Sequence, residues 1–487
     1  MSEPTSTPTK NTDRVAIVGA GPAGLSVARA LKTLGLDFTV FEKHDDVGGI
    51  WDVHNSGSPM YRSAHFISSK TMSGHYAYPM PEHYPDYPSN SQILGYIRNF
   101  TEDSGLYPHI RFSTSVQEVN YEDGLWQVTT SKQGEASTNP QGSSQNSSQG
   151  EASTTEAYRW LICANGTNWT PNRPSLKGED SFDGEVIHSV DYHDADLMKG
   201  KRVLVVGAGN SGVDIACDAA FNADQAYISL RRGYHFVPKN IFGMPADVFG
   251  EQSSWMPTRL RQIVFGAMLR VLNGDLTRLG LPKPDHRVMS SHPILNSQIL
   301  HYLQHGDIQA KSDIDHLSGQ RVHFVDGTTQ EVDLIILATG YQWRLPYLSD
   351  EFFEWKNNRP QTFLKVFNKQ HPSLFINGFI ETNGGAYKLF DEMAYMIAKT
   401  IQAQAEDANH AAKIQSFIEG PEPDLGGQVS YVKSDRHTGY TNTEAYRAAM
   451  KVMCRRLGWK SLSEDFYSSA ATNSSVGTAE LEPLSEN

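Results

Sequence analysis

The chain has 487 residues, enough for two to four domains, and 39% of them are apolar, as in folded globular proteins. Its 42 Lys and Arg residues against 55 Asp and Glu residues give a net charge of −13. Because phosphate backbones and anionic membrane surfaces repel such a chain, we expect no nucleic-acid partner and no membrane-surface role.

The first predicted unit lies near the N-terminus. Residues 14–18 form a short apolar run, residues 25–35 fit a helix, and residues 37–41 fit a second strand. Between the first strand and the helix stands Gly-Ala-Gly-Pro-Ala-Gly, a pattern that lets a helix N-terminus hold a dinucleotide pyrophosphate. The candidate residues of this turn are Gly19, Ala20, Gly21, Pro22, Ala23 and Gly24. Glu42 follows 23 residues after Gly19, where an acid accepts hydrogen bonds from a ribose diol.

Residues 131–157 contain no Leu, Ile, Val or aromatic side chain, and the hexapeptide Gln-Gly-Glu-Ala-Ser-Thr occurs there twice. Such a segment has too little apolar surface to become ordered by burial. Strand-like runs flank it on both sides, so we predict a disordered hairpin-loop insertion without a catalytic role.

A second unit repeats the first. Residues 201–206 and 225–230 fit strands, residues 213–221 fit a helix, and the turn reads Gly-Ala-Gly-Asn-Ser-Gly. Its candidate residues are Gly207, Gly209, Asn210, Ser211 and Gly212. At the end of the second strand stand Arg231 and Arg232, where cations suit a 2′-phosphate that an acid would repel.

Two such units predict an α/β fold with two Rossmann-like dinucleotide-binding domains, one for FAD and one for NADPH. Residues 332–340 look like a return strand, so we expect the NADPH domain to be inserted in the FAD domain. The predicted boundaries are 10–168 and 333–462 for the FAD domain, 169–332 for the NADPH domain, and 463–487 for a disordered tail.

Cys163, Cys217 and Cys454 are far apart and form no CxxC pair, which excludes a disulfide reductase and favours buried free thiols. No apolar run approaches about 18 residues, so we expect no membrane span. These features favour a cytoplasmic enzyme. The cluster of Asp191, His193 and its acidic neighbours matches no standard metal spacing, so we expect no metal.

Residues 182–193 read Phe-Asp-Gly-Glu-Val-Ile-His-Ser-Val-Asp-Tyr-His. This stretch resembles the FxGxxxHxxx(Y/F) fingerprint of the flavin-containing monooxygenases, class B flavoproteins, although its last position, usually Lys or Arg, is His193. Its matching residues are Phe182, Gly184, His188 and Tyr192. Related Baeyer–Villiger monooxygenases carry Trp in place of Tyr192. The resemblance extends over about 14–400.

The resemblance implies that NADPH reduces FAD, that the reduced flavin forms a C4a-hydroperoxide with O₂, and that an amine nitrogen or a sulfur of a small molecule takes one oxygen. It also implies that His188 couples NADPH binding to catalysis and that Tyr341 lies near the flavin pocket. The further FAD candidates are Lys43, Gly49, Ile50, Trp51, Val116 and Gly340. The further NADP candidates are Ala338 and Thr339.

The chain departs from the family where many members place an Asn at the flavin edge, because the aligned residue is Ile67, which cannot donate a hydrogen bond. Either His65 or Ser68 takes that role, or oxygenation is poorly coupled. No catalytic residue is therefore assigned with certainty. An uncoupled NADPH oxidase, a Baeyer–Villiger ketone oxygenase and a nonenzymatic NADPH sensor stay open. So do the substrate and a homodimeric state.

Overall fold

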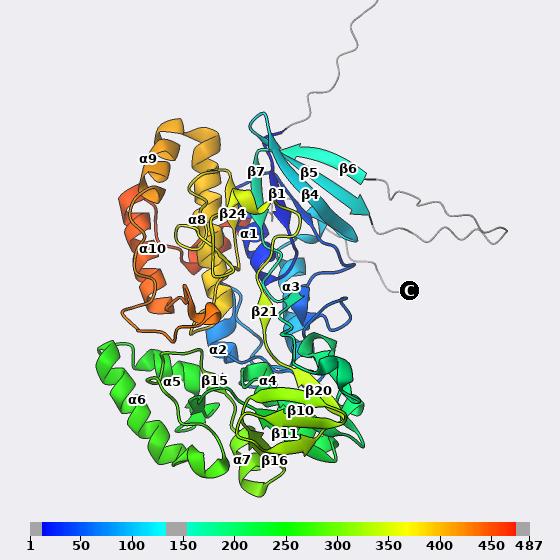
Figure 1. Cartoon of the computed structure of the whole chain (residues 1–487). Helices are drawn as coiled ribbons and strands as arrows, with labels where there is room; N and C mark the ends of the chain where they lie inside the picture. Colours follow the sequence, from blue (N-terminus) through cyan, green and yellow to red (C-terminus); the bar gives the residue numbers. More distant parts are fainter. Residues whose placement is uncertain (1–11, 133–152, 474–487) are drawn as a thin grey trace, which may run out of the picture.

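The computed structural model describes residues 12–132 and 153–473, which form two units, each built on a parallel five-stranded sheet (Figure 1). The sheet of the first unit has the order β24 (Leu374–Ile376), β7 (Trp160–Cys163), β1 (Val15–Val18), β2 (Phe38–Phe41) and β3 (Ile110–Arg111). The sheet of the second unit has the order β16 (Ile308–Lys311), β11 (Gln225–Ser229), β10 (Arg202–Val206), β20 (Leu334–Leu337) and β9 (Glu185–His188).

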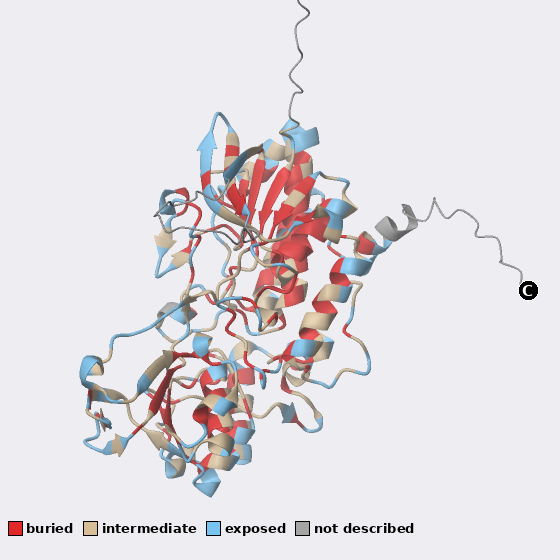
Figure 2. Ribbon diagram, turned by 90° about the vertical axis from the view of Figure 1, so that its right-hand side faces the viewer, coloured by how far each residue is buried: buried red, intermediate tan, exposed pale blue. Residues whose placement is uncertain are grey.

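Both faces of the first sheet are covered, which explains why its strands are apolar throughout. Val15 and Ile17 pack toward the helices α1 (Pro22–Thr33) and α8 (Ala386–Glu406), while Ala16 and Val18 face the opposite layer. That layer is the antiparallel sheet of β4 (Thr114–Glu122), β5 (Leu125–Lys132) and β6 (Ser153–Tyr158). Figure 2 shows the resulting band of buried strands.

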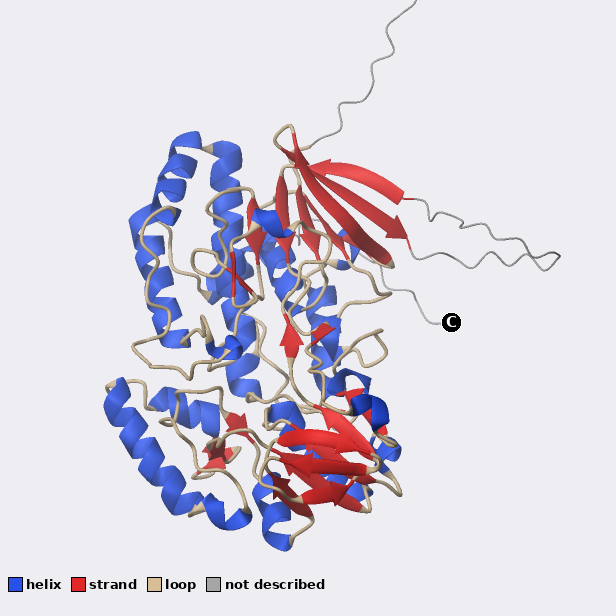
Figure 3. Ribbon diagram, viewed as in Figure 1, coloured by secondary structure: helices blue, strands red, loops and turns tan. Residues whose placement is uncertain are grey.

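The second sheet is covered in the same way. Val203 and Val205 contact the layer of α4 (Asn210–Asn222) and α7 (Gln298–His305), and Leu204 faces the other side. That side is covered by the antiparallel sheet of β17 (Ile314–Ser318), β18 (Arg321–Phe324) and β19 (Thr329–Glu331). Figure 3 shows the strands and helices of this unit in the lower part of the molecule. The predicted α/β fold with two Rossmann-like units is confirmed.

Two linker strands, which lie side by side, connect the units. β8 (Thr170–Pro171) and β21 (Tyr341–Gln342) pair antiparallel, so the chain leaves and re-enters the first unit through one narrow ribbon. The remaining helices are α2 (Lys70–Ser73), α3 (Asn90–Asp103), α5 (Ala246–Gln252), α6 (Thr258–Asn273), α9 (Ala408–Ile418), α10 (Thr443–Leu457) and α11 (Glu464–Asn473). The remaining strands are β12 (Phe236–Val237), β13 (Asn240–Ile241), β14 (Met244–Pro245), β15 (Ile294–Leu295), β22 (Trp355–Lys356) and β23 (Arg359–Pro360). Of the helices that the structure describes, none has both the length and the apolar character for crossing a membrane.

The boundary predicted at residue 333 is wrong. Leu334–Leu337 pairs in parallel with β10 and β9, so this strand belongs to the second sheet and not to the first unit. A four-residue apolar strand fits the centre of either sheet equally well, and only its pairing decides.

Two segments predicted to be disordered are partly ordered. Ser131 pairs with Ser153, so the hairpin strands continue into both ends of the predicted insertion. Polar residues pair here through their main chains, which composition does not reveal. In the predicted tail, α11 forms and its Tyr467 is buried under the guanidinium of Arg29, 3.6 Å from the ring centroid. Residues 1–11, 133–152 and 474–487 lie outside the described part of the chain.

Candidate cofactor-binding site

The two glycine turns have nearly the same backbone geometry. The φ angle is +105° at Gly19 and +104° at Gly207, values that residues other than glycine rarely adopt. A Cβ atom on either glycine would lie 2.7 Å from a carbonyl oxygen of the neighbouring strand end, that of Ala164 or Ala338. Each turn therefore requires glycine where its strand ends.

The third glycine of each turn lets the helix approach the strand closely. A Cβ atom on Gly24 would lie 1.9 Å from the carbonyl oxygen of Gly19, and one on Gly212 would lie 2.1 Å from that of Gly207. Any side chain at these positions would push the helix away from its sheet.

The middle glycines, Gly21 and Gly209, are the N-cap residues of α1 and α4, and both are extended. Among the described residues, no side chain accepts a capping hydrogen bond at the N-terminus of either helix. The first main-chain N–H groups of each helix are thus left for an external acceptor, and the helix dipole favours an anion there. A dinucleotide pyrophosphate fits both positions.

Glu42 lies beside the first turn at the end of β2, and it is 5% exposed. Its carboxylate accepts hydrogen bonds from the main-chain N–H of Ala20 at 2.7 Å and of His44 at 3.0 Å. The main-chain N–H of Thr114 donates to the Glu42 carbonyl, which brings the start of β4 and the predicted Val116 to this strand end. The Nζ of the neighbouring Lys43 lies over the ring of Trp169, 4.1 Å from its centroid.

Arg231 lies at the same strand end in the second unit, just beyond β11, and it is exposed. By register with the central strand, the counterpart of Glu42 is the buried Leu230, one residue before Arg231. Arg232 lies 5.2 Å from the ring centroid of Tyr234. An acid in the first unit and a cation in the second thus follow corresponding strands, and the cation lies one residue further along the chain.

The side chain of Asn210 is not free for a ligand. Its amide donates to the carbonyl of Pro293 at 3.1 Å, and its Oδ1 accepts the N–H of Leu295 at 2.9 Å. As a candidate for NADP binding, Asn210 can therefore offer only its main chain. Ser211, the next residue of the same helix N-terminus, is exposed.

Gly49, Ile50 and Trp51 form a 3₁₀ turn opposite the first glycine turn. A Cβ atom on Gly49 would lie 3.1 Å from Cα of Gly21, so the two backbones approach closely. Buried Asn55 donates to the Gly49 carbonyl at 2.8 Å and Ser58 donates to that of Ile50 at 2.6 Å. These bonds fix the turn.

The structure brings the segment of Ile67 next to Trp51, because the rings of Trp51 and Phe66 pack with centroids 5.1 Å apart. Ile67 and Ser68 are half-buried. His65 is exposed, and its Nδ1 bonds to the carbonyl of Ser63 at 2.8 Å. His65 is therefore used locally, and Ser68 becomes the better candidate for the missing donor.

His188 holds the ribbon between the units. It is 1% exposed, its Nδ1 accepts the N–H of Val190 at 3.2 Å, and its Nε2 donates to the carbonyl of Gly340 at 3.1 Å. Burial lowers the pKa of His188, in agreement with a neutral ring that uses both nitrogens. Thr339 donates to the carbonyl of Asn172 across the same ribbon at 2.6 Å. This geometry suits positioning and not proton transfer.

The other fingerprint residues are also accounted for by packing. A Cβ atom on Gly184 would lie 2.6 Å from the ring of Phe182. Tyr192 is buried, and its hydroxyl donates to Asp218 on α4 at 2.8 Å. Ser63 donates to the same carboxylate oxygen, so Asp218 connects the fingerprint to the segment that leads to Ile67. Asp218 was missed from the sequence because no motif marks it.

The thiol and metal predictions concern residues outside the two glycine turns. Cys163, Cys217 and Cys454 are all free and buried, and burial raises the pKa of Cys163 and of Cys217 to about 12. The described residues contain no group of three or more His, Cys, Asp or Glu side chains placed to hold a metal ion. Asp194, from the cluster weighed for a metal, pairs with Arg62.

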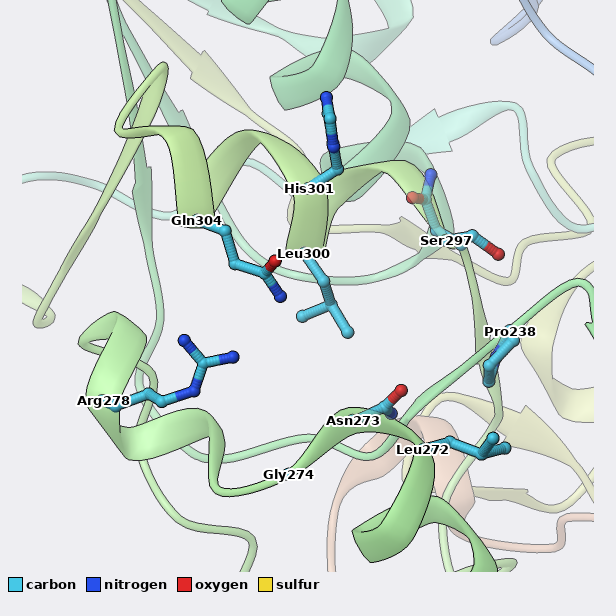
Figure 4. A pocket seen from close by; sticks show the side chains of 10 residues that line it. Pro238, Leu272, Asn273, Gly274, Arg278, Ser297, Leu300, His301 and Gln304 are labelled. Carbon is cyan, nitrogen blue, oxygen red and sulfur yellow. The ribbon is translucent and has the colours of Figure 1, made fainter.

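A separate hollow of about 490 Å³ lies in the second unit between α6 and α7 (Figure 4). Leu300, His301 and Gln304 line one side, and Leu272 and Arg278 line the other. None of the turn or strand-end residues described above lines it, so it is separate from the candidate cofactor site.

Comparison with known protein families shows which family contains this chain. The model of the family described as flavin-binding monooxygenase-like matches residues 12–435. The chain belongs to this family. It is thus a flavin-dependent monooxygenase, an oxidoreductase.

The chain is 29% identical to flavin-containing monooxygenase 5 of Oryctolagus cuniculus over 451 residues, 87% of this chain and 79% of that protein. It is 30% identical to the probable indole-3-pyruvate monooxygenase YUCCA9 of Arabidopsis thaliana over 377 residues, 74% of this chain and 83% of that protein. Among solved structures, cyclohexanone monooxygenase with ε-caprolactone bound matches with a TM-score of 0.64 at 18% identity, covering 92% of this chain and 98% of that one. That last likeness concerns the fold alone.

Proposed function

We propose that this flavin-dependent monooxygenase binds FAD at the first glycine turn and NADPH at the second, and that it transfers one oxygen of O₂ to a soft nucleophile, an amine nitrogen or a sulfur. The observation that carries the proposal is the contrast between Glu42 and Arg231 at corresponding strand ends. An acid accepts from free ribose hydroxyls, and a cation pairs with a 2′-phosphate.

The residues would act mainly by binding and positioning. A bound flavin supplies the redox chemistry, taking electrons from NADPH and activating O₂. The N-termini of α1 and α4 would hold the two pyrophosphates. Trp51, packed on Phe66, would close one side of the flavin site against water. His188 and Tyr192 would fix the second unit relative to the segment of Ile67.

The coenzyme part of the proposal is tested by anaerobic reduction of the flavin-loaded protein. NADPH should bleach the flavin absorbance at far lower concentration than NADH does. In the variant Arg231→Ala, NADPH should lose about 10- to 150-fold in affinity, the value of one charge-assisted hydrogen bond, while NADH should hardly change. Equal losses for both coenzymes would remove Arg231 from the 2′-phosphate site.

The oxygen-transfer part is tested with isotope-labelled O₂ and three substrates, a tertiary amine, a thioether and a cyclic ketone. One labelled oxygen should appear in the amine or thioether product. Label in an ester made from the ketone alone would favour a Baeyer–Villiger oxygenase instead. The hydroxyl of Tyr192, bonded to Asp218, supports the first result because the related ketone oxygenases carry Trp at this position.

One observation favours a second candidate function, an NADPH oxidase that releases hydrogen peroxide. Ile67 offers no hydrogen bond at the flavin edge, and the ring of His65 is engaged by Ser63. Peroxide equal to the NADPH consumed, whatever substrate is added, would establish the oxidase.

A further inference from the structure

A cation from the first unit lies over the glycine turn of the second. Arg436 is part of the 3₁₀ turn Asp435–His437, which precedes α10 at the boundary between the units (Figure 1). A Cβ atom on Gly209 would lie 3.7 Å from Nη1 of Arg436. The missing side chain of this middle glycine is what allows a pyrophosphate to approach the main chain. The guanidinium therefore borders the space that a pyrophosphate would take.

The turn that carries Arg436 is fastened to the second unit. The main-chain N–H of His292 donates to Nε2 of His437 at 2.8 Å. Three residues further along, the main-chain N–H of Leu295 donates to Asn210, the first residue of α4, at 2.9 Å. One short stretch of the second unit thus contacts both the helix N-terminus and the turn of Arg436, which fixes their separation.

The charge around Arg436 leaves room for an anion. Its Nε lies 3.4 Å from one carboxylate oxygen of Glu381, and the guanidinium of Arg359 lies 3.9 Å from the other. The Arg436 side chain is 43% exposed, so part of its fork is open to solvent. The open part of the Arg436 guanidinium can therefore meet an anion, and a guanidinium fork matches phosphate oxygens well.

We propose that Arg436 binds the pyrophosphate of the NADP coenzyme at the second glycine turn, so that the coenzyme is held between the two units. This inference rests on the proposed use of NADPH and adds a binding residue from the other unit. Arg436 would act on the pyrophosphate, whereas Arg231 would act on the 2′-phosphate, so the two residues should differ in which ligands they affect.

The test measures the Kd of NADP⁺ and of adenosine 2′-monophosphate, which lacks the pyrophosphate, for the flavin-loaded full chain by titration calorimetry. Arg436→Gln should raise the Kd of NADP⁺ by about 10- to 150-fold and change the Kd of adenosine 2′-monophosphate by no more than about twofold. Arg231→Ala should weaken both ligands. Glu381→Gln should lower the Kd of NADP⁺, because it removes the carboxylate that competes with the pyrophosphate for Arg436. The matched control Arg455→Gln, an exposed residue on α10, should change neither Kd.

Unchanged NADP⁺ binding in Arg436→Gln would overturn the inference, and so would an equal loss for both ligands, which would mean general damage to the site. If Arg436→Gln does not fold, Arg436→Lys keeps the charge without the fork and should still weaken NADP⁺ selectively; no change would overturn the inference. A wild-type protein that binds neither ligand would overturn the proposed use of NADPH and this inference with it. If wild type binds NADP⁺ tightly and the Arg436 variants bind it equally well, this inference is overturned but the proposed use of NADPH is not.

Discussion

Gly24 and Gly212 stand at equivalent residues of the two turns, and each offers a test of one cofactor. An Ala side chain would meet a carbonyl oxygen at 1.9 Å or 2.1 Å, which requires the helix to move. Overpacking of this kind costs about 1–3 kcal/mol, or about 5- to 150-fold in affinity if the shift falls on the binding site. We expect Gly24→Ala to lose flavin, and Gly212→Ala to keep flavin but bind NADP⁺ weakly.

The control for this pair is Gly95→Ala on α3, where an added Cβ would make only an ordinary contact, 3.8 Å from the Tyr84 hydroxyl. It should retain full flavin content and NADP⁺ affinity. Flavin content by absorbance and NADP⁺ affinity by calorimetry are the measurements. Loss of both cofactors in Gly212→Ala would show that the two turns do not act separately.

Ile67→Asn tests whether the missing amide limits coupling. The substitution places a donor beside the segment packed on Trp51, and one hydrogen bond contributes about 0.5–1.5 kcal/mol. Peroxide release should slow by about 2- to 10-fold relative to wild type. The rate of peroxide release from the reduced, re-aerated protein without substrate is the measurement, and Ile67→Val is the control that adds no donor. Faster release in Ile67→Asn than in Ile67→Val would point to Ser68 as the resident donor.

At the scale of the elements, the hairpin of β5 and β6 can be tested by two deletions. One removes only the long connection between the strands, and the other also removes their paired ends. Removing 133–152 and joining the strands with a short turn should leave flavin content and the melting temperature unchanged. Removing 131–157 should lower the melting temperature, because it also deletes Glu156, which pairs with Arg14 and Arg111. Although burial raises the pKa of Glu156, hydrogen bonds from these two arginines hold it at about 2.

Thermal unfolding of the two deletion proteins decides between these expectations. Equal melting temperatures would mean that the paired ends of the strands contribute nothing. A loss of flavin in the shorter deletion would give 133–152 a role that neither its composition nor the hairpin predicts.

For the whole molecule, the contact between the units should depend on pH through His437. Burial, followed by the nearby Arg436, lowers the pKa of His437 to about 4, and its Nε2 must stay unprotonated to accept from His292. An unfolded chain takes up this proton below about pH 6.5, before the folded one does. Stability is therefore lost as the pH falls from about 6.5 to about 4.

The variant His437→Gln can still accept the N–H of His292 but does not titrate. Its free energy of unfolding should fall less steeply between about pH 6.5 and about pH 4 than that of wild type. The exposed His65→Gln serves as the control for replacing a histidine by glutamine elsewhere. Denaturant unfolding at several pH values gives the slopes, and identical slopes for His437→Gln and wild type would contradict the expectation.

Local sequence determined the turns, because their constraints act over a few residues. A motif of six residues, from the end of a buried strand into the first turn of a helix, is enough to require glycine at Gly19 and Gly24. Glu42 and Arg231 follow after the next strand, which has four residues in one unit and five in the other. Both turns, the two-unit α/β fold and the family follow from such short-range patterns. The roles of the turn residues in binding cofactors stay predictions.

Tertiary structure alone decided what depends on residues far apart in the chain. Leu334–Leu337 could pair in either sheet, and only the strands β10 and β9 assigned it to the second. Arg436 lies more than two hundred residues after Gly209, in a segment without a motif, and it reaches the turn because His292 and His437 hold the two units together. No local pattern encodes such a contact, because its strength comes from burial and pairing that exist only when both units are folded.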